Sequence, residues 1–237
     1  MHEFWMGLGG VCMYFAVAAS VGIVIRLFTP IPNEPFRKLL HLILLGSLAV
    51  WVQVYDTWWM AALSAVLFAV AVYPLLALAE HLQGYSELLT ERKTGELKRS
   101  LLIVFGMFAI VISVCWGWLN DRLLAVASVF AWGFGDAAAA LVGKRFGRHK
   151  LRGRHIEGTK SVEGSAAMFI VSFVSVAAVL LLRGGMGAVG CVVTAYVTAS
   201  VCTVVELYSM GGNDTITCPL AAMAMLLPLV HLFGGGI

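Results

Sequence analysis

Eight long apolar runs constrain the fold of this chain more than any other feature of its sequence. A run of about 17–25 apolar residues is long enough to cross the hydrocarbon core of a bilayer as a helix. The runs cover approximately residues 5–28, 39–55, 58–79, 100–118, 123–143, 165–182, 186–207 and 215–233. Only 12% of the 237 residues are charged, about half the usual fraction in soluble domains. The sequence therefore predicts an all-α polytopic membrane protein with about eight transmembrane helices, forming one domain over residues 1–237.

The basic residues are distributed unevenly between the connections. All of the 16 Lys and Arg residues except Arg122 and Arg183 lie between runs one and two, three and four, or five and six, or at the adjoining helix ends. By the positive-inside rule these connections face the cytoplasm and both termini face the opposite side. Because the cations lie in short loops next to a bilayer, a nucleic-acid partner is not expected.

Several local patterns carry structural expectations. Trp51, Trp58 and Trp59 flank a short turn and are expected to be interfacial anchors. The polar segment 80–100 is expected to contain a short interfacial helix, and Pro219 and Pro228 are expected to break the last helix. All five Cys are expected to be small core residues: Cys12, Cys115, Cys191, Cys202 and Cys218.

Asp136 is the one carboxylate inside the fifth apolar run. A charged side chain at the centre of a membrane helix costs about 2.5–3.5 kcal/mol on insertion scales, so such a residue is a candidate for function. The neighbouring Gly133, Gly135 and the Ala137–Ala140 run offer a small-residue surface on which another helix can pack closely. We therefore expect Asp136 to lie between helices and away from lipid.

A basic, glycine-containing loop follows this helix. Glycines allow close approach of the backbone, and cations favour a phosphate-bearing ligand. The start of the next helix would add backbone N–H groups. The simpler alternative is that the cations only keep the loop in the cytoplasm. The predicted nucleotide- and phosphate-binding residues here are Gly143, Lys144, Arg145, Gly147, Arg148, Lys150, Lys160 and Ser161.

Three further carboxylates, Glu163, Glu206 and Asp214, map to the same membrane face as Asp136 by the predicted topology. Mg²⁺ takes one or two carboxylates together with phosphate oxygens. These four residues are therefore the predicted ligands of a magnesium nucleotide. The candidate catalytic residues are Asp136, Glu163 and Asp214, and which of them accepts a proton stays open.

Three motifs in this order resemble those of the CTP-dependent lipid-alcohol kinases, which include dolichol, phytol and diacylglycerol kinases. They are GDAAAALVGKRFG from Gly135, EGTKSVEGS from Glu157 and DTITCPL from Asp214. The resemblance extends over approximately residues 37–219 and implies an active-site core at about 123–219. The family's last motif usually reads DNxTxP, and Thr215 replaces its Asn here. Adjacent Asn213 is a possible substitute.

The second apolar run opens with Arg37, Lys38 and His41, and this R-K-x-x-H pattern also resembles the family. Arg37 and His41 are four residues apart and so share one helix face. Two interpretations stay open for the three residues. They bind phosphate at the active site, or they are two snorkelling cations and a hydrogen-bonded interfacial His.

The resemblance implies a kinase that transfers the γ-phosphoryl group of CTP to the hydroxyl of a membrane lipid alcohol, with Mg²⁺ as cofactor. The lipid, whether a polyprenol, a phytol-like alcohol or diacylglycerol, is left open, as is the oligomeric state. A weaker resemblance to CDP-diacylglycerol synthases gives phosphatidate cytidylyltransferase as an alternative. A transporter with Asp136 as its coupling carboxylate is an alternative from another class.

Overall fold

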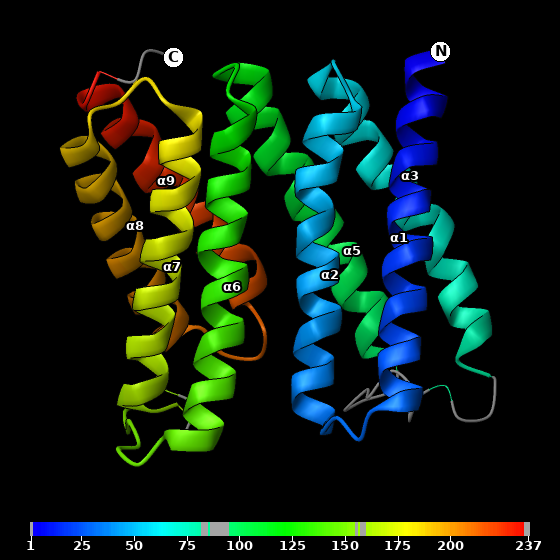
Figure 1. Ribbon diagram of the computed structural model, residues 1–237, viewed down its shortest axis with the longest axis horizontal. Helices are drawn as coiled ribbons and strands as arrows, with labels where there is room; N and C mark the ends of the chain where they lie inside the picture. Colours follow the sequence, from blue (N-terminus) through cyan, green and yellow to red (C-terminus); the bar gives the residue numbers. More distant parts are fainter. Residues whose placement is uncertain (1, 82–84, 86–94, 155, 157–159, 235–237) are drawn as a thin grey trace. The chain divides into compact units, whose positions relative to one another are not determined.

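The computed structural model describes residues 2–81, 85, 95–154, 156 and 160–234. Within these ranges lie eight helices that are long and apolar enough to span a membrane. They are α1 (His2–Phe28), α2 (Asn33–Val54), α3 (Trp58–Ala79), α5 (Glu96–Val111) with its π-helical continuation η1 (Ile112–Trp118), α6 (Arg122–Phe146), α7 (Val162–Arg183), α8 (Ala188–Tyr208) and α9 (Asp214–Leu232) (Figure 1). The prediction of an all-α polytopic membrane protein is confirmed.

The chain forms two compact units, Met1–Ser113 and Val114–Ile237. In the first unit α1 packs on α2 and α3 packs on α5. Trp51 of α2 lies in the core of this unit, fully buried, and donates its indole N–H to Ser64 Oγ at 2.7 Å. Around it pack the rings of Phe15, Phe68, Phe105 and Phe108. The prediction that Trp51 is an interfacial anchor is therefore wrong, because its indole completes an aromatic core; Trp58 and Trp59 are exposed.

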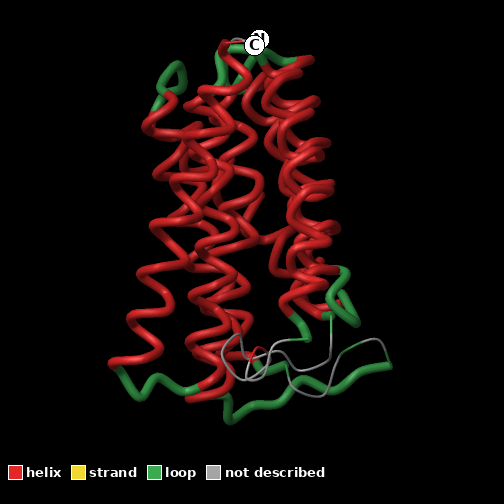
Figure 2. Tube along the Cα trace, turned by 90° about the vertical axis from the view of Figure 1, so that its right-hand side faces the viewer, coloured by secondary structure: helices red, strands yellow, loops and turns green. Residues whose placement is uncertain are grey.

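In the second unit α6 packs on both α7 and α9, and α8 packs on α7 and α9. Each of these four helices runs antiparallel to the next, and their connections gather at the helix ends (Figures 1 and 2). The α8–α9 turn is different. Drawn in orange in Figure 1, it lies well above the lower ends of α6 and α7. This inset turn carries part of the candidate site.

Small residues bring α6 and α7 together. A Cβ added to Gly135 would lie 2.3 Å from Ser172 Oγ and 2.6 Å from Met168 Sδ. A Cβ added to Gly164 of α7 would lie 3.0 Å from the carbonyl oxygen of Ala139. Ser172 also donates its hydroxyl to the carbonyl of Ala131. The predicted close helix contact along the small-residue surface of α6 is confirmed.

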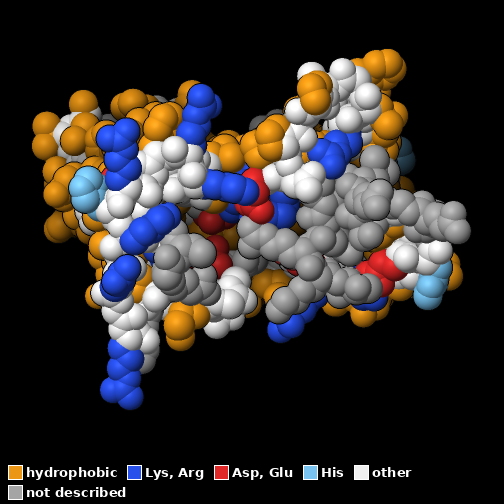
Figure 3. Space-filling model, turned by 90° about the horizontal axis from the view of Figure 1, so that it is seen from below, with side chains coloured by type: hydrophobic (Ala, Val, Ile, Leu, Met, Phe, Trp, Pro, Cys, Tyr) orange, Lys and Arg blue, Asp and Glu red, His pale blue; other side chains and the backbone are white. Residues whose placement is uncertain are grey.

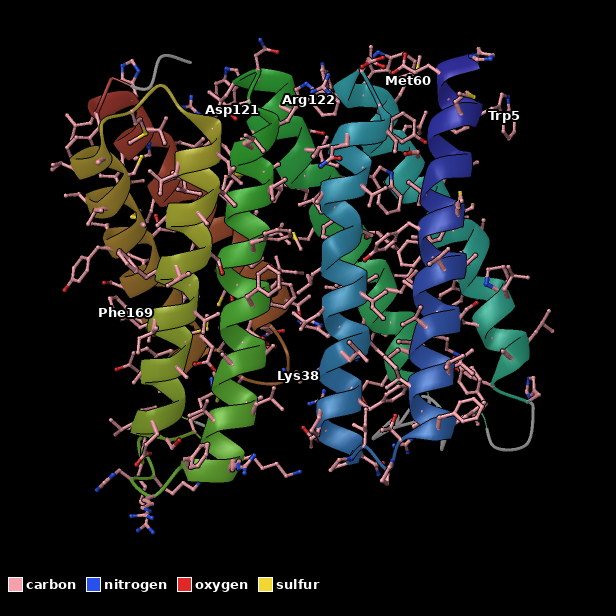
Figure 4. All side chains as sticks on the ribbon, in the orientation of Figure 1. Trp5, Lys38, Met60, Asp121, Arg122 and Phe169 are labelled. Atoms are coloured by element: carbon pink, nitrogen blue, oxygen red, sulfur yellow. The ribbon has the colours of Figure 1, made fainter. Side chains whose placement is uncertain are left out.

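At the opposite end of this unit, polar contacts hold the helix ends. Asp121 caps α6 by accepting hydrogen bonds from the N–H groups of Leu123 and Leu124 at 3.0 and 3.2 Å, and it also pairs with Arg183 at the end of α7. The guanidinium of Arg122 lies 4.2 Å from the centroid of the Trp116 ring. Figure 4 labels Asp121 and Arg122 at this end of α6. Both cations that depart from the charge bias, Arg122 and Arg183, thus have structural partners.

Two local expectations need correction, and a third concerns residues that are mostly outside the described part of the chain. Pro219 and Pro228 lie inside α9, which continues through both residues instead of breaking. Membrane helices tolerate such prolines because neighbouring helices and side chains can provide partners for the backbone groups that the proline leaves without a hydrogen bond. Cys12 is exposed, whereas the other four Cys are buried as expected. Most of the expected interfacial helix at 80–100 lies outside the described residues.

Candidate functional site

The connection between α6 and α7 folds back on itself as a short hairpin. The N–H of Leu151 donates to the carbonyl of Lys160 and the N–H of Val162 to that of His149, both at 3.0 Å. Seen from this end, the unit carries many Lys and Arg side chains (Figure 3). The exposed cations of the hairpin and the adjoining α6 terminus are Lys144, Arg145, Arg148, Lys150, Arg152 and Arg154. The basic loop is therefore presented to solvent at the end of the unit.

Ser161 and Glu163 hold the start of α7. Ser161 is the N-cap and accepts a hydrogen bond from the N–H of Gly164 at 3.2 Å, a common way to satisfy a helix terminus. Glu163 accepts from the backbone N–H of His149 at 3.2 Å and contacts His149 Nδ1 at 2.7 Å. These contacts fix the base of the hairpin on α7. Phosphate binding by Ser161 and metal binding by Glu163 stay predictions.

The glycines of the motif serve contacts within the protein. A Cβ on Gly143 would lie 3.3 Å from Ser161 Oγ and 3.6 Å from the Cα of Gly164. A Cβ on Gly147 would meet the carbonyl oxygen of Gly143 at 2.2 Å and Ser161 Oγ at 2.6 Å. A Cβ therefore has no room at Gly147, whereas at Gly143 it would require Ser161 to shift by a few tenths of an ångström. Direct contact of Gly143 and Gly147 with a phosphate stays a prediction.

Two of the predicted carboxylates, Asp136 and Asp214, lie within electrostatic range of a third, Glu206. Glu206 lies in the last turn of α8 and Asp214 is the first residue of α9. Both Asp136 and Asp214 are close enough to Glu206 to repel its negative charge. We call Asp136, Glu206 and Asp214 the acidic cluster. Carboxylates within an apolar bundle are costly, so they need nearby positive charge or hydrogen-bond donors.

The acidic cluster lies deep in the unit. Trp132 of α6 is fully buried and donates its indole N–H to Asp214 Oδ2 at 3.1 Å. Trp132 precedes the end of α6, Phe146, by fourteen residues, which is about 20 Å at a rise of 1.5 Å per residue. Asp136 is one turn nearer to that end. The inset α8–α9 turn thus carries Asp214 into the bundle (Figure 1).

Lys160 reaches the same turn from the hairpin. Its ammonium lies 3.2 Å from Glu206 Oε1 and donates to the carbonyls of Glu206, Leu207 and Ser209. The side chain of Lys160 is only 14% exposed and that of Glu206 only 12%. Lys160 therefore supplies positive charge at the edge of the acidic cluster. The predicted contact between Lys160 and a triphosphate is not tested by this arrangement.

The metal site predicted from the four carboxylates stays a prediction. In the described part of the chain, no group of three or more His, Cys, Asp or Glu residues is arranged as a complete metal site. Mg²⁺ does not require one, because it commonly uses one or two carboxylates and completes its shell with phosphate oxygens and water. Asp136 and Asp214 are the two carboxylates that we consider for this mode, and Asp214 also accepts a hydrogen bond from Trp132.

Thr215, which replaces the motif Asn, and Asn213, its possible substitute, lie at the start of α9. Asn213 is exposed and its side chain makes no capping hydrogen bond to α9. Its carbonyl accepts from the N–H and the hydroxyl of Thr217, both at 3.0 Å. Thr215 is half-buried. The side chain of Asn213 is therefore not used to cap α9, and its substitution for the missing motif amide stays a prediction.

Arg37, Lys38 and His41 lie on α2, in the first unit. Arg37 pairs with Glu34 at 3.2 Å and Glu96 at 3.8 Å, and Lys38 is buried. These contacts join the start of α2 to the start of α5. A role for the three residues at the phosphate site stays a prediction.

Sequence reasoning missed two residues that position the site, Trp132 and His149. Trp132 precedes Asp136 by one helical turn, and a polar-tipped aromatic residue beside an intramembrane carboxylate is the signal that could have found it. His149 lies in the basic loop, and no sequence pattern distinguished it from the Lys and Arg residues around it. Neither contact could be paired from spacing alone, because the partners are fourteen and 82 residues away.

The fold and this site define a class: a polytopic helical membrane protein with carboxylates held inside one bundle and exposed cations at its end. Two known proteins are similar to the chain. A phytol kinase from Synechocystis sp. is 26% identical over 228 residues, covering 92% of this chain and 89% of that protein. A probable chloroplastic phytol kinase from Triticum aestivum is 32% identical over 141 residues, covering 56% of this chain and 45% of that protein.

The matched region thus spans less than half of the Triticum protein but nearly all of the Synechocystis one. No family model matches the chain, and no solved structure matches it. The two similarities support a lipid-alcohol kinase family, as the sequence motifs indicate. They likewise support a kinase, that is, a phosphotransferase.

Proposed function

We propose that this protein transfers the γ-phosphoryl group of CTP to the hydroxyl of a membrane lipid alcohol. The observation that carries the proposal is the acidic cluster inside the α6–α9 unit, set back from the end of the unit that presents exposed cations. Because both relatives are named phytol kinases, a phytol-like alcohol is the first candidate acceptor. A polyprenol and diacylglycerol are the other candidates.

The two parts of the site suit the two substrates. A triphosphate is soluble and highly charged, so it is expected to approach from the exposed end, where Lys144, Arg145, Arg148 and Lys150 offer cations. A lipid alcohol is held in the bilayer, and its hydroxyl reaches the site from the membrane. The depth of Asp214, about 20 Å from the end of α6, favours such an acceptor over a water-soluble one. By the charge bias, the exposed end faces the cytoplasm.

Phosphoryl transfer depends mainly on positioning and on neutralising charge at the transferred group. In our proposal Asp136 and Asp214 would hold Mg²⁺, whose charge would offset that of the phosphate oxygens. Trp132 orients the Asp214 carboxylate by its hydrogen bond. One of the carboxylates Asp136, Glu163 or Asp214 accepts the proton of the lipid hydroxyl.

Product analysis with the purified full-length protein tests this proposal. The protein is incubated with Mg²⁺ and CTP labelled in either the α- or the γ-phosphoryl group, with phytol, a polyprenol, diacylglycerol or phosphatidate as acceptor. Transfer of the γ label to an alcohol, with release of CDP, is the expected result. ATP labelled in the γ position is the comparison that tests nucleotide choice.

Other outcomes would replace the proposal. Incorporation of the α label into lipid with phosphatidate would show a cytidylyltransferase. Preference for ATP would contradict the CTP assignment while leaving the lipid kinase in place. Nucleotide binding with no labelled lipid for any acceptor would favour a carrier that uses Asp136 as its coupling group.

A further inference from the structure

The contacts of Lys160 differ from those expected of a phosphate ligand. Its ammonium has three N–H donors, and it makes hydrogen bonds to three backbone carbonyls, those of Glu206, Leu207 and Ser209. The last carbonyls of a helix lack intrahelical partners and carry the negative end of the helix dipole. Lys160 therefore satisfies the end of α8, and it also pairs with the Glu206 carboxylate at 3.2 Å.

This arrangement ties three parts of the chain together. Lys160 stands two residues before α7, and the carbonyl of Lys160 accepts from Leu151 in the hairpin at 3.0 Å. Its side chain reaches the α8–α9 turn 46–49 residues later. Across that turn, Oγ of Ser209, the C-cap of α8, lies 2.9 Å from Thr217 Oγ1 of α9. The position of the inset turn, and with it Glu206 and Asp214, thus depends on Lys160.

We propose that Lys160 is a positioning residue that anchors the end of α8 and so sets the acidic cluster, and that it does not bind the nucleotide directly. A Lys160 that bound phosphate would have to give up its contacts with these three carbonyls and with the Glu206 carboxylate. As an anchor, Lys160 acts on transfer through the carboxylates. The kinetic part of this inference rests on the proposed function, whereas its structural part does not.

Two native thiols report on the anchored turn. Cys202 precedes Glu206 by one helical turn, and Cys218 follows Asp214 by one turn. Both are fully buried, and the Sγ atom of each lies 3.8 Å from the backbone carbonyl oxygen of the other. Buried thiols react only when local opening exposes them. The reaction rate of Cys202 and Cys218 therefore measures how firmly α8 and α9 are held at this level.

The structural experiment compares Lys160→Met with Arg154→Met, in a background where Cys12, Cys115 and Cys191 are replaced by Ala. Arg154 is an exposed cation of the same hairpin and serves as the matched control. Maleimide labelling of the two remaining thiols is followed in the detergent-solubilised protein. We expect Lys160→Met to raise the labelling rate by about tenfold or more and Arg154→Met to leave it unchanged. An unchanged rate in Lys160→Met would overturn the anchoring role.

The kinetic experiment separates anchoring from phosphate binding. A displaced acidic cluster should lower kcat/KM for CTP in Lys160→Met together with the protection of the two thiols, because the same displacement causes both losses. Lys160→Arg keeps a cation that can donate to the same carbonyls, so it should retain more of both kcat and thiol protection. If Lys160→Met does not accumulate as folded protein, Lys160→Arg is compared with the unsubstituted protein instead. The anchoring role then requires that any loss of kcat in Lys160→Arg be accompanied by a loss of thiol protection.

Two outcomes distinguish failure of the inference from failure of the proposed function. A large rise in KM for CTP with the thiols still protected would show that Lys160 binds phosphate, and would overturn the inference alone. Absence of transfer by the unsubstituted protein would overturn the proposed function, and the labelling rates would still support or overturn the anchoring role.

Discussion

Trp132 in the middle of α6 donates its indole N–H to Asp214, the first residue of α9, at 3.1 Å. The two residues are 82 positions apart in the chain. This one contact places the start of α9 about halfway along α6 instead of at its end. It also brings a carboxylate from the last motif next to the helix that carries Asp136, one turn from Trp132.

Replacing Asp136 by Asn should abolish transfer while the protein still inserts and folds. The amide keeps the volume of the carboxylate and removes only its charge, so a structural Asp would tolerate the change. A magnesium ligand would not, and we expect a loss of about 10³-fold or more in kcat/KM. Transfer assays on purified protein check this, with Asp56→Asn in the exposed α2–α3 turn as the control.

Measuring Mg-CTP affinity on the same Asp136→Asn preparation separates two roles. A metal ligand should weaken nucleotide binding. A residue that only accepts the hydroxyl proton should leave affinity nearly unchanged and lower the rate by about 10²- to 10⁴-fold. Near-normal transfer would remove Asp136 from the mechanism, and Glu206 and Asp214 would then be tested in its place.

Replacing Trp132 by Phe should lower transfer by about tenfold or more. The substitution keeps an aromatic ring and removes the N–H that Asp214 accepts, a hydrogen bond to a charged group worth about 1.5–3 kcal/mol. The matched control is Trp51→Phe, which removes a buried indole hydrogen bond to Ser64 in the other unit. Thermal unfolding should show a loss of stability in both variants, and the transfer rate should fall only in Trp132→Phe. Equal rates in the two variants would contradict a role for this contact.

Replacing Gly164 by Ala should destabilise the α6–α7 contact by about 1–3 kcal/mol, the usual cost of overpacking. The new methyl group would lie 3.0 Å from the backbone carbonyl oxygen of Ala139 and 3.4 Å from the Cα of Gly143, and neither atom can move without shifting α6. Gly106 in α5 is the control, because a Cβ there meets no atom within 4 Å. The unfolding temperatures of Gly164→Ala and Gly106→Ala are compared in detergent. Equal values would contradict a tight contact between α6 and α7 at Gly164.

Cysteines placed at the two ends of the α6–α9 unit should be labelled from opposite sides of the membrane. Arg152 lies in the hairpin before α7 and Gly187 in the turn after it, at opposite ends of a helix of 22 residues (Figure 1). Such a helix is about 33 Å long, enough to cross the hydrocarbon core. With the native Cys replaced, an impermeant maleimide should reach Arg152→Cys from the cytoplasmic side and Gly187→Cys from the other. Labelling of both from one side would contradict a membrane-spanning α7.

The sequence by itself determined the eight helices and the order of the motifs. Length and apolar composition are local properties, and a helix that satisfies its own backbone in lipid needs no information from distant residues. For this reason the predicted runs and the observed helices agree closely, except where α2 and α5 begin earlier, at Asn33 and Glu96. The small-residue face of α6 was legible for the same reason.

Only the tertiary structure decided which helix faces meet. Trp51 reads as an interfacial anchor, yet it is buried because Phe15, Phe68, Phe105 and Phe108 surround it. The phosphate contact predicted for Lys160 stays a prediction, whereas its contacts with the end of α8 could not be predicted from the sequence. Whether a side chain contacts a distant residue depends on the rotation and depth of both helices, and apolar periodicity does not specify these. The depth of the α8–α9 turn, which places Asp214 beside Trp132, is the physical feature that no local pattern could supply.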